Sequence, residues 1–362
     1  MKTIIHIVGA RPNFIKAAPL IKSISDLKVR NLVVHTGQHY DHNMSQQFFD
    51  DLEIPKPDYN LGLGGGSHAV QTANIMMQCE QVFIKESPDC VIVYGDVNSC
   101  IAAALVAKKL HIQVVHIESG LRSFDTKMPE EINRIITDSI SDQLFVTCKD
   151  GVDNLIKEGK SIDCIHLVGN TMIDSLVKFQ SKFDTSSILS SMNIQSKKYI
   201  LSTLHRPSNV DNKNSLIELM ESMKAISNNN IVVFPIHPRT KSNLQKFNIF
   251  KKYNSIDSLK IIDPLGYIDF MCLQKNAKLI ITDSGGIQEE SSFFNVPCLT
   301  VRDNTERPIT TTMGTNKLIG SNYKNILSEL DIVNYNQNSN INLWDGSTAS
   351  RIVQILKGIY KW

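Results

Sequence analysis

The sequence predicts an α/β protein with two doubly wound, Rossmann-like parallel-sheet domains that face a cleft. Its 362 residues exceed what one hydrophobic core usually serves, which favours about two domains. Short apolar runs rich in β-branched residues recur, and each precedes a small or polar turn and a longer amphipathic stretch, as is typical of βα units. A Ser- and Lys-rich stretch at 181–197 separates two such series.

Both series supply candidate strands in chain order. The first comprises Ile4–Val8, Leu32–Thr36, Val91–Tyr94, Val114–Ile117, Leu144–Thr147 and Ile165–Val168, and the second Tyr199–Thr203, Ile231–Pro235, Lys260–Ile262, Leu279–Thr282, Cys298–Val301 and Lys317–Ile319. We expect an N-terminal domain at 1–175, a C-terminal domain at 176–345 and a terminal segment at 346–362. Apolar residues share one face of a helix over 349–360, so that segment is predicted to be an amphipathic helix.

Composition narrows the class of protein. Apolar residues make up 42% of the chain, and no apolar run is long enough to span a bilayer, so we expect a cytoplasmic protein. The net charge of +2 and the mixing of basic with acidic residues argue against a nucleic-acid partner. Seven scattered cysteines without CxxC spacing suggest reduced core thiols. His35, His39 and His42 cluster, but Gly37 interrupts them, so no metal is expected.

Polar residues that follow the predicted strands of the first half are candidates for chemistry, because parallel sheets bind ligands beyond these strand ends. The loop from Gly9 to Lys16 carries Arg11 and Lys16 at a helix start, which suits an anion, although a solvated helix start would look the same. Asp96 follows a very apolar strand and is either an acid for catalysis or a helix-capping residue.

Two further acids follow in the next segment. Glu118 comes at the end of a predicted strand, and no helix begins there that its side chain could cap. A purely structural role for this acid is therefore harder to find. Glu130 and Arg134 are one helical turn apart, so they are either site residues or an i,i+4 ion pair.

In the second half, strand ends place His205 beside Arg206 and His237 beside Arg239, a pairing that suits phosphate or sugar contacts. The segment 282–290 reads as strand, glycine turn and helix. Its glycines would let the backbone approach a diphosphate, a serine would donate to it, and a glutamate would accept from a ribose diol. Arg307 adds a cation after the next strand. Together these features favour a nucleoside diphosphate ligand.

The combined motifs resemble those of the non-hydrolysing UDP-N-acetylglucosamine 2-epimerases, which have the glycosyltransferase-B fold. The matching segments are GARPNFIKAAPL at 9–20, HTGQHYD at 35–41, YGDVNS at 94–99, HIESGLRSFDTKMPEEINR at 116–134, TLHR at 203–206, HPR at 237–239 and DSGGIQEE through RDNTERP at 283–308. The resemblance therefore runs nearly end to end. Two departures are Asn13, where many members carry glutamate, and Ser119, where alanine is more usual.

The resemblance implies roles for individual residues. Those implied to bind UDP or substrate are Arg11, Lys16, Arg134, His205, His237, Ser284, Gly285, Gly286, Glu290 and Arg307, and those implied around the sugar as catalytic residues are Asp96, Glu118, Glu130 and His205. It also implies a homodimer, a terminal helix that returns to the N-terminal domain, no cofactor, and a second, regulatory UDP-N-acetylglucosamine near Gln38, His39, Arg206 and His237.

The implied reaction is reversible epimerisation at C2 by anti elimination of UDP to 2-acetamidoglucal, followed by re-addition. Proton transfer on opposite faces of C2 needs two groups, for which the three acids of the first half are candidates. Rival readings are a hydrolysing 2-epimerase, a UDP-sugar glycosyltransferase of the same fold and a sensor without turnover. An epimerase acting on a related sugar, such as a diacetamido uronic acid, also remains open. A nicotinamide enzyme is disfavoured because no GxGxxG follows a strand.

Overall fold

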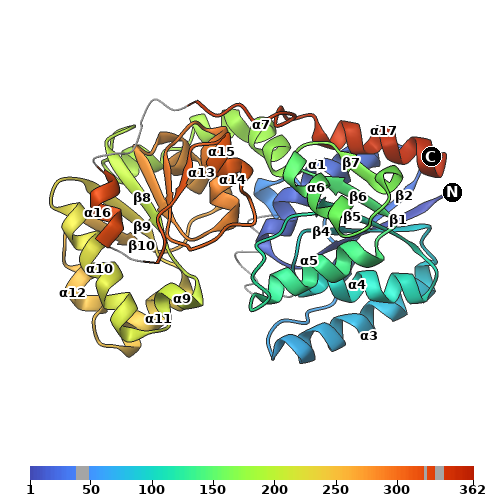
Figure 1. Ribbon diagram of the computed structural model, residues 1–362, viewed down its shortest axis with the longest axis horizontal. Coiled ribbons are helices and arrows are strands. Elements are labelled where there is room, and N and C mark those ends of the chain that lie inside the picture. Colours follow the sequence, from blue (N-terminus) through green and yellow to red (C-terminus); the bar gives the residue numbers. More distant parts are fainter. Residues whose placement is uncertain (38–48, 322–323, 331–337) are drawn as a thin grey trace. The chain divides into compact units, whose positions relative to one another are not determined.

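The computed structural model describes residues 1–37, 49–321, 324–330 and 338–362, and it divides into two compact units. The first unit comprises residues 1–179 and 342–362, and the second comprises residues 180–341. Each unit is built on one parallel sheet, as the sequence predicts (Figure 1). No helix among the described residues is long and apolar enough to cross a membrane.

The sheet of the first unit has seven strands in the order β3-β2-β1-β4-β5-β6-β7. They are β1 (Thr3–Val8), β2 (Arg30–His35), β3 (Tyr59–Asn60), β4 (Cys90–Tyr94), β5 (Gln113–Ser119), β6 (Gln143–Val146) and β7 (Ile165–Leu167). Every residue of β1 and β4 is buried, as expected of central parallel strands covered on both faces. β3 is the strand that the sequence did not predict.

The helices of this unit are α1 (Arg11–Ser25), α3 (His68–Glu86), α4 (Asn98–Lys109), α5 (Pro129–Ile140), α6 (Lys149–Lys157), the short η1 (Ile162–Cys164), α7 (Thr171–Asp184) and the C-terminal α17 (Thr348–Tyr360). Apolar side chains of α3 and α4 pack against the central strands and form the core. Figure 1 shows α17 beside α1, in agreement with the contacts between the two helices.

The attachment of α17 to the first unit confirms the predicted return of the terminal helix. The Asp174 carboxylate accepts hydrogen bonds from the backbone N–H groups of Thr348 (3.0 Å) and Ala349 (2.6 Å) at the start of α17. Arg351 donates to the Val168 carbonyl at 2.7 Å. The two bonds to Asp174 satisfy N–H groups that a helix start leaves without an intrahelical partner.

The sheet of the second unit has six strands in the order β10-β9-β8-β11-β12-β13. They are β8 (Tyr199–Thr203), β9 (Ile231–Pro235), β10 (Leu259–Ile262), β11 (Leu279–Thr282), β12 (Cys298–Thr300) and β13 (Asn316–Leu318). The helices are α8 (Ile188–Ser191), α9 (Pro207–Val210), α10 (Lys213–Ser227), α11 (Pro238–Lys246), α12 (Phe250–Asn254), α13 (Tyr267–Asn276), α14 (Gly285–Phe293), α15 (Ile309–Thr312) and α16 (Lys324–Leu330). Two buried apolar clusters, one centred on α10 and the other including residues of α13 and α14, complete its core.

Both sheets reverse their strand order at one point, between β1 and β4 in the first and between β8 and β11 in the second. At such a point the loops leave neighbouring strands in opposite directions and open a crevice at the carboxyl ends. The predicted site segments follow these four strands, at Gly9–Lys16, Asp96, His205 and Ser284.

Candidate active site

The loop after β1 is fixed by one buried amide. Asn13 accepts hydrogen bonds from the N–H groups of Gly9 (3.2 Å) and Ala10 (3.0 Å), and its own amide donates to the Tyr94 carbonyl at 2.7 Å. It therefore ties the start of α1 to the end of β4 across the switch point. A carboxylate at this position could accept the first two bonds but could not donate the third.

Lys16 of α1 and Glu118 near the end of β5 form a buried ion pair. Lys16 Nζ lies 2.6 Å from Glu118 Oε2, and both side chains are less than 5% exposed. Gly95 makes room for the pair, because a Cβ there would lie 2.9 Å from Lys16 Nζ. Glu118 has a φ of +69°. A non-glycine residue in this region costs about 1–3 kcal/mol and is concentrated at functional sites.

A second buried cation holds Asp96 after β4. Arg134 of α5 donates from Nε (3.0 Å) and Nη2 (2.8 Å) to Asp96 Oδ2. The Arg134 side chain is 3% exposed and that of Asp96 is 21% exposed, so the acid is the more accessible partner. Asn133 donates to the Asp96 carbonyl at 2.9 Å. Lys16, Asp96, Glu118 and Arg134 are thus brought together around Gly95.

Two glutamates lie in the first turn of α5, and the sequence reasoning singled out only Glu130. The structure gives the other, Glu131, a structural role. It is buried, pairs with Arg134, and accepts hydrogen bonds from the N–H groups of Ser123 (3.0 Å) and Phe124 (2.9 Å). Glu130 is half-buried in the first turn of α5. Arg134 binds Asp96 and Glu131, while a part for Glu130 in the chemistry stays a prediction.

In the second unit, buried Asp283 holds His205. His205 Nδ1 lies 3.0 Å from Asp283 Oδ1, and the N–H groups of His205 (2.9 Å) and Arg206 (2.8 Å) donate to the same carboxylate. Burial alone would raise the pKa of Asp283, but the contact with His205 and the other donors outweigh it, so the pKa is lowered. Asp283 therefore fixes a ring that remains 38% exposed.

His237 lies beside His205 at the end of β9. The two ring centroids are 5.1 Å apart, and His237 Nδ1 accepts a hydrogen bond from the Arg239 N–H at 3.1 Å. Arg206 Nε donates to the Asp283 carbonyl at 3.1 Å. Of the four residues predicted for regulation, Arg206 and His237 thus lie in one region, whereas Gln38 and His39 lie outside the described residues.

The start of α14 has the predicted order of strand, glycine turn and helix, and its role as a diphosphate site stays a prediction. Ser284 is the N-cap residue, and Gly285 and Gly286 begin the helix, where backbone N–H groups are available to an anion. A Cβ on Gly285 would lie 2.5 Å from both Arg307 Nη1 and Glu306 Oε1. Only glycine allows Arg307 to approach this turn so closely.

Buried carboxylates support Arg307. Its Nε lies 2.8 Å from Glu289 Oε2, and Glu306 pairs with Nη1. The predicted ribose acceptor Glu290 is also buried and accepts a hydrogen bond from Gln274 Nε2 at 2.6 Å. Sequence reasoning did not assign supporting roles to Asp283, Glu289 and Glu306. The signals in the sequence are that Asp283 lies beside the glycine turn and that Glu306 precedes Arg307, whereas only its neighbour Glu290 marks Glu289.

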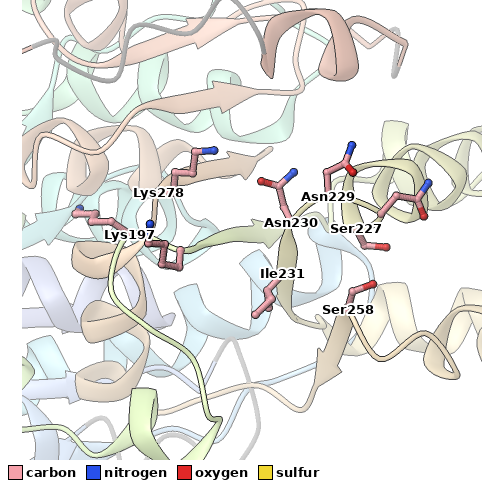
Figure 2. A pocket seen from close by; sticks show the side chains of 9 residues that line it. Lys197, Ser227, Asn229, Asn230, Ile231, Ser258 and Lys278 are labelled. Carbon is pink, nitrogen blue, oxygen red and sulfur yellow. The ribbon is translucent and has the colours of Figure 1, made fainter.

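A pocket also opens at the opposite edge of the second sheet, and none of the predicted site residues lines it. This hollow has a volume of about 490 Å³ and is lined by Lys197, Lys198, Ser227, Asn228, Asn229, Asn230, Ile231, Ser258 and Lys278. Figure 2 shows the side chains that line it. It lies at the amino ends of β8, β9, β10 and β11. Ligands of open parallel sheets bind at the carboxyl ends, so the chemistry is assigned there and not to this hollow.

Comparison with known proteins identifies the group to which this site belongs. Residues 22–357 match the family model described as UDP-N-acetylglucosamine 2-epimerase. The UDP-N-acetylglucosamine 2-epimerase homolog of Methanococcus maripaludis is 45% identical over 98% of this chain and 99% of its own length. The UDP-2,3-diacetamido-2,3-dideoxy-D-glucuronate 2-epimerase of Pseudomonas aeruginosa is 43% identical over 88% of each chain.

A solved structure agrees over the whole fold. The crystal structure of the UDP-N-acetylglucosamine 2-epimerase of Methanocaldococcus jannaschii, in complex with UDP-N-acetylglucosamine and UDP, superposes with a TM-score of 0.92 at 43% sequence identity. The match covers 99% of this chain and 100% of that one.

Proposed function

The chain belongs to the UDP-N-acetylglucosamine 2-epimerase family, and from this premise we propose that it interconverts UDP-N-acetylglucosamine and UDP-N-acetylmannosamine without a metal or nicotinamide. The observation that carries the proposal is the pair of acid–cation contacts around Gly95, Lys16 with Glu118 and Arg134 with Asp96. They supply carboxylates from two separate strands, as proton transfer on two faces of one carbon requires.

The chemistry explains why elimination is the easier route. The C2 proton of the sugar has no neighbouring carbonyl to acidify it, so direct removal is slow. If the bond from C1 to the UDP oxygen breaks first, C1 gains positive character and the C2 proton can pass to a carboxylate. The products held in the site are UDP and 2-acetamidoglucal. A proton then returns to the opposite face of C2 while the UDP oxygen re-forms the bond to C1.

Asp96, Glu118 and Glu130 are the proposed proton-transfer groups, with His205 beside the sugar. One well-placed group of this kind contributes about 10²–10⁴-fold to the rate. The Lys16 ammonium and the Arg134 guanidinium, each less than 5% exposed, fix the two carboxylates that they touch. Both cations would also attract UDP as its negative charge develops, together with Arg11 at the start of α1.

UDP is proposed to lie against the start of α14. Gly285 and Gly286 would direct backbone N–H groups at the diphosphate, and the Ser284 hydroxyl would donate to it. Arg307 would neutralise the diphosphate, and Glu290 would accept from the ribose. His237 lies beside His205 and would join the substrate contacts. This assignment accounts for the glycine at 285, where a side chain would collide with Arg307.

Proton NMR in D₂O tests the reaction directly. The purified protein is incubated with UDP-N-acetylglucosamine and no added metal or nicotinamide. Accumulation of two UDP-sugars with deuterium at C2 is the expected result, because the C2 proton exchanges with solvent during elimination. Release of UDP with free sugar would show a hydrolysing enzyme, and an unchanged spectrum would mean that this nucleotide sugar is not the substrate.

A second candidate substrate is a UDP-diacetamido uronic acid, since the Pseudomonas aeruginosa epimerase of that class is 43% identical to this chain. Both reactions need the same acids and the same UDP site. Competition between the two nucleotide sugars, read as the ratio of kcat/KM values, decides between them. UDP-N-acetylmannosamine as the product would suit precursor synthesis for a surface polysaccharide or capsule, in the cytoplasm.

We further propose a homodimer formed through α3 and α5. The buried face of α5 is polar, with Glu131, Asn133, Arg134, Thr137 and Asp138, and two of its isoleucines point outward. Ile132 and Ile135 are exposed, as are Val70 and Met77 of α3. A helix with an apolar outer face favours a partner that covers it. Light scattering of Ile132→Glu is expected to show a monomer, whereas Ile162→Glu, an exposed control outside these helices, stays dimeric.

Regulation by a second substrate molecule near Gln38, His39, Arg206 and His237 is proposed from the family resemblance. Sigmoidal dependence of rate on UDP-N-acetylglucosamine concentration is expected, and Arg206→Ala would make it hyperbolic. A hyperbolic wild-type curve would remove the regulatory role.

A further inference from the structure

His116 is a fully buried histidine of β5 to which no role has yet been assigned. It is 0% exposed and precedes Glu118 by two residues. Its Nδ1 lies 2.7 Å from Asp138 Oδ1 on α5, and its Nε2 lies 2.8 Å from the Gly95 carbonyl oxygen after β4. One ring therefore bridges the end of one central strand to the polar face of α5.

Both partners of the ring can only accept hydrogen bonds. Asp138 Oδ2 accepts from the Gly120 N–H at 3.0 Å and lies 2.7 Å from Arg122 Nη1. Burial would raise the pKa of Asp138, but His116 and Arg122 lower it. The Arg122 guanidinium and the Gly120 N–H favour the carboxylate form of Asp138 whatever the charge of His116. The Gly95 carbonyl has no proton to donate. A neutral imidazole carries a single N–H and would leave a bare nitrogen against one of these oxygens.

We propose that His116 is held as a buried imidazolium and that it is a positioning residue for the Gly95–Asp96 peptide of the epimerase site. The charges around it balance: His116 and Arg122 carry positive charge, Asp138 is negative, and Glu158 pairs with the other side of Arg122 at 2.7 Å. On its own strand, Glu118 is already paired with Lys16. A permanent positive charge on His116 is therefore neutralised by the adjacent Asp138 carboxylate of α5.

The peptide that His116 holds lies at the centre of the four site residues of the first unit. Gly95 has a φ of +68°, and Lys16 Nζ packs where a Cβ would stand. None of the described peptide bonds is cis, so the Asp96 N–H points away from the ring that binds the Gly95 carbonyl. A cation on that carbonyl polarises the peptide and fixes the direction in which Asp96 leaves β4. His116 acts through Asp96 and Lys16 without touching the substrate.

Nitrogen NMR of the histidine rings tests the charge without relying on catalysis. In protein labelled with ¹⁵N-histidine, one ring is expected to show two protonated nitrogens at neutral pH, as an imidazolium does. His116→Gln should remove this signal and identify it. If that variant does not fold, variants of the other histidines assign it by elimination. A signal with one unprotonated nitrogen at neutral pH would overturn the proposal.

Kinetics test the positioning role, and this arm rests on the proposed epimerase function. His116→Gln keeps a donor but loses the charge and the two-sided bridge, so we expect kcat to fall by up to about 100-fold with KM nearly unchanged. The matched control is His166→Gln, a half-buried histidine of β7 bonded to Gln143 at 2.7 Å, which should keep wild-type turnover. A folded His116→Gln with wild-type kcat would refute the role. An inactive wild-type enzyme would refute the function while the NMR result still decides the charge.

Discussion

In each unit, the most accessible ion pair of the candidate site lies at a strand end next to the switch point, and the two pairs reverse which charge is buried. In the first unit Arg134 is buried and Asp96 is the more accessible partner, whereas both members of the Lys16–Glu118 pair are buried. In the second unit Asp283 is buried and His205 is the more accessible partner, whereas Arg307 is buried together with Glu289 and Glu306. The same doubly wound frame therefore presents carboxylates on one sheet and positive or neutral donors on the other.

This difference separates two tasks of one reaction. Proton transfer at a carbon needs carboxylates whose position is fixed, and departure of a diphosphate needs positive donors whose position is fixed. A buried counter-charge fixes either kind, because a buried ion keeps its geometry only while it is paired. If the comparison is right, removing an accessible member should damage function, and removing a buried member should damage stability.

Asp96→Asn should produce the largest effect on function. The change removes an accessible acid of the first unit while preserving the shape that Arg134 holds, so we expect the protein to fold and kcat to fall by about 10²–10⁴-fold. Turnover is measured by coupled detection of UDP-N-acetylmannosamine. Asp153→Asn, an exposed acid of α6 paired with Lys149 at 3.5 Å, is the control that should keep full activity. Near-normal turnover in folded Asp96→Asn would show that the accessible acid of the first unit does not serve catalysis.

Arg307→Ala should be the most destabilising change in the second unit. The change leaves two buried carboxylates, Glu289 and Glu306, without their cation. Removing one partner of a buried ion pair costs about 3–5 kcal/mol. UDP affinity, measured by calorimetry, should fall as well. The control is Arg239→Ala, whose pair with Asp211 is exposed and should be worth at most about 1 kcal/mol in urea unfolding. Equal losses in the two variants would show that burial does not govern these pairs.

Gly285→Ala adds one methyl group where Arg307 approaches the start of α14. The new carbon would lie 2.5 Å from Arg307 Nη1, and overpacking of this kind costs about 1–3 kcal/mol. We expect weaker UDP binding with little change in the rate of the chemical step. Gly358→Ala on α17 has open space around the added carbon and should be neutral or stabilising. Unchanged UDP affinity in Gly285→Ala would move the diphosphate away from this turn.

Most of the fold was predictable because parallel strands are buried on both faces and read as short apolar runs. The strands Tyr199–Thr203, Ile231–Pro235 and Leu279–Thr282 have the predicted bounds, and the other predicted strands differ at their ends by one or two residues. Tyr59–Asn60 was missed because two residues are too few for any periodic signal. Strand ends also indicated the candidate site segments, since ligands of such sheets bind there, and these segments stay predictions.

The pairings inside the site were not predictable from the sequence. Lys16 and Glu118 meet only through the parallel order of β1, β4 and β5, which no local pattern records. The choice between neighbouring acids was equally hidden. Glu131 is buried beside half-buried Glu130 because the inner face of α5 is polar, while Ile132 and Ile135 are exposed. Apolar periodicity, which usually marks the buried face, points the wrong way there.

The smallest effect we predict is a pH dependence of the unfolding free energy, which tests the charge of Asp283 behind His205 in the second unit. The pKa of Asp283 is lowered in the folded protein, so its stabilisation is present above the unfolded-state value near pH 4 and is lost as the pH falls through the folded value. Asp283→Asn has no carboxyl to titrate. The difference in unfolding free energy between wild type and variant should therefore shrink on acidification, by at most about 1.4 kcal/mol per pH unit. A constant difference from neutral pH to about pH 3 would mean that His205 is held by shape and not by the charge of Asp283.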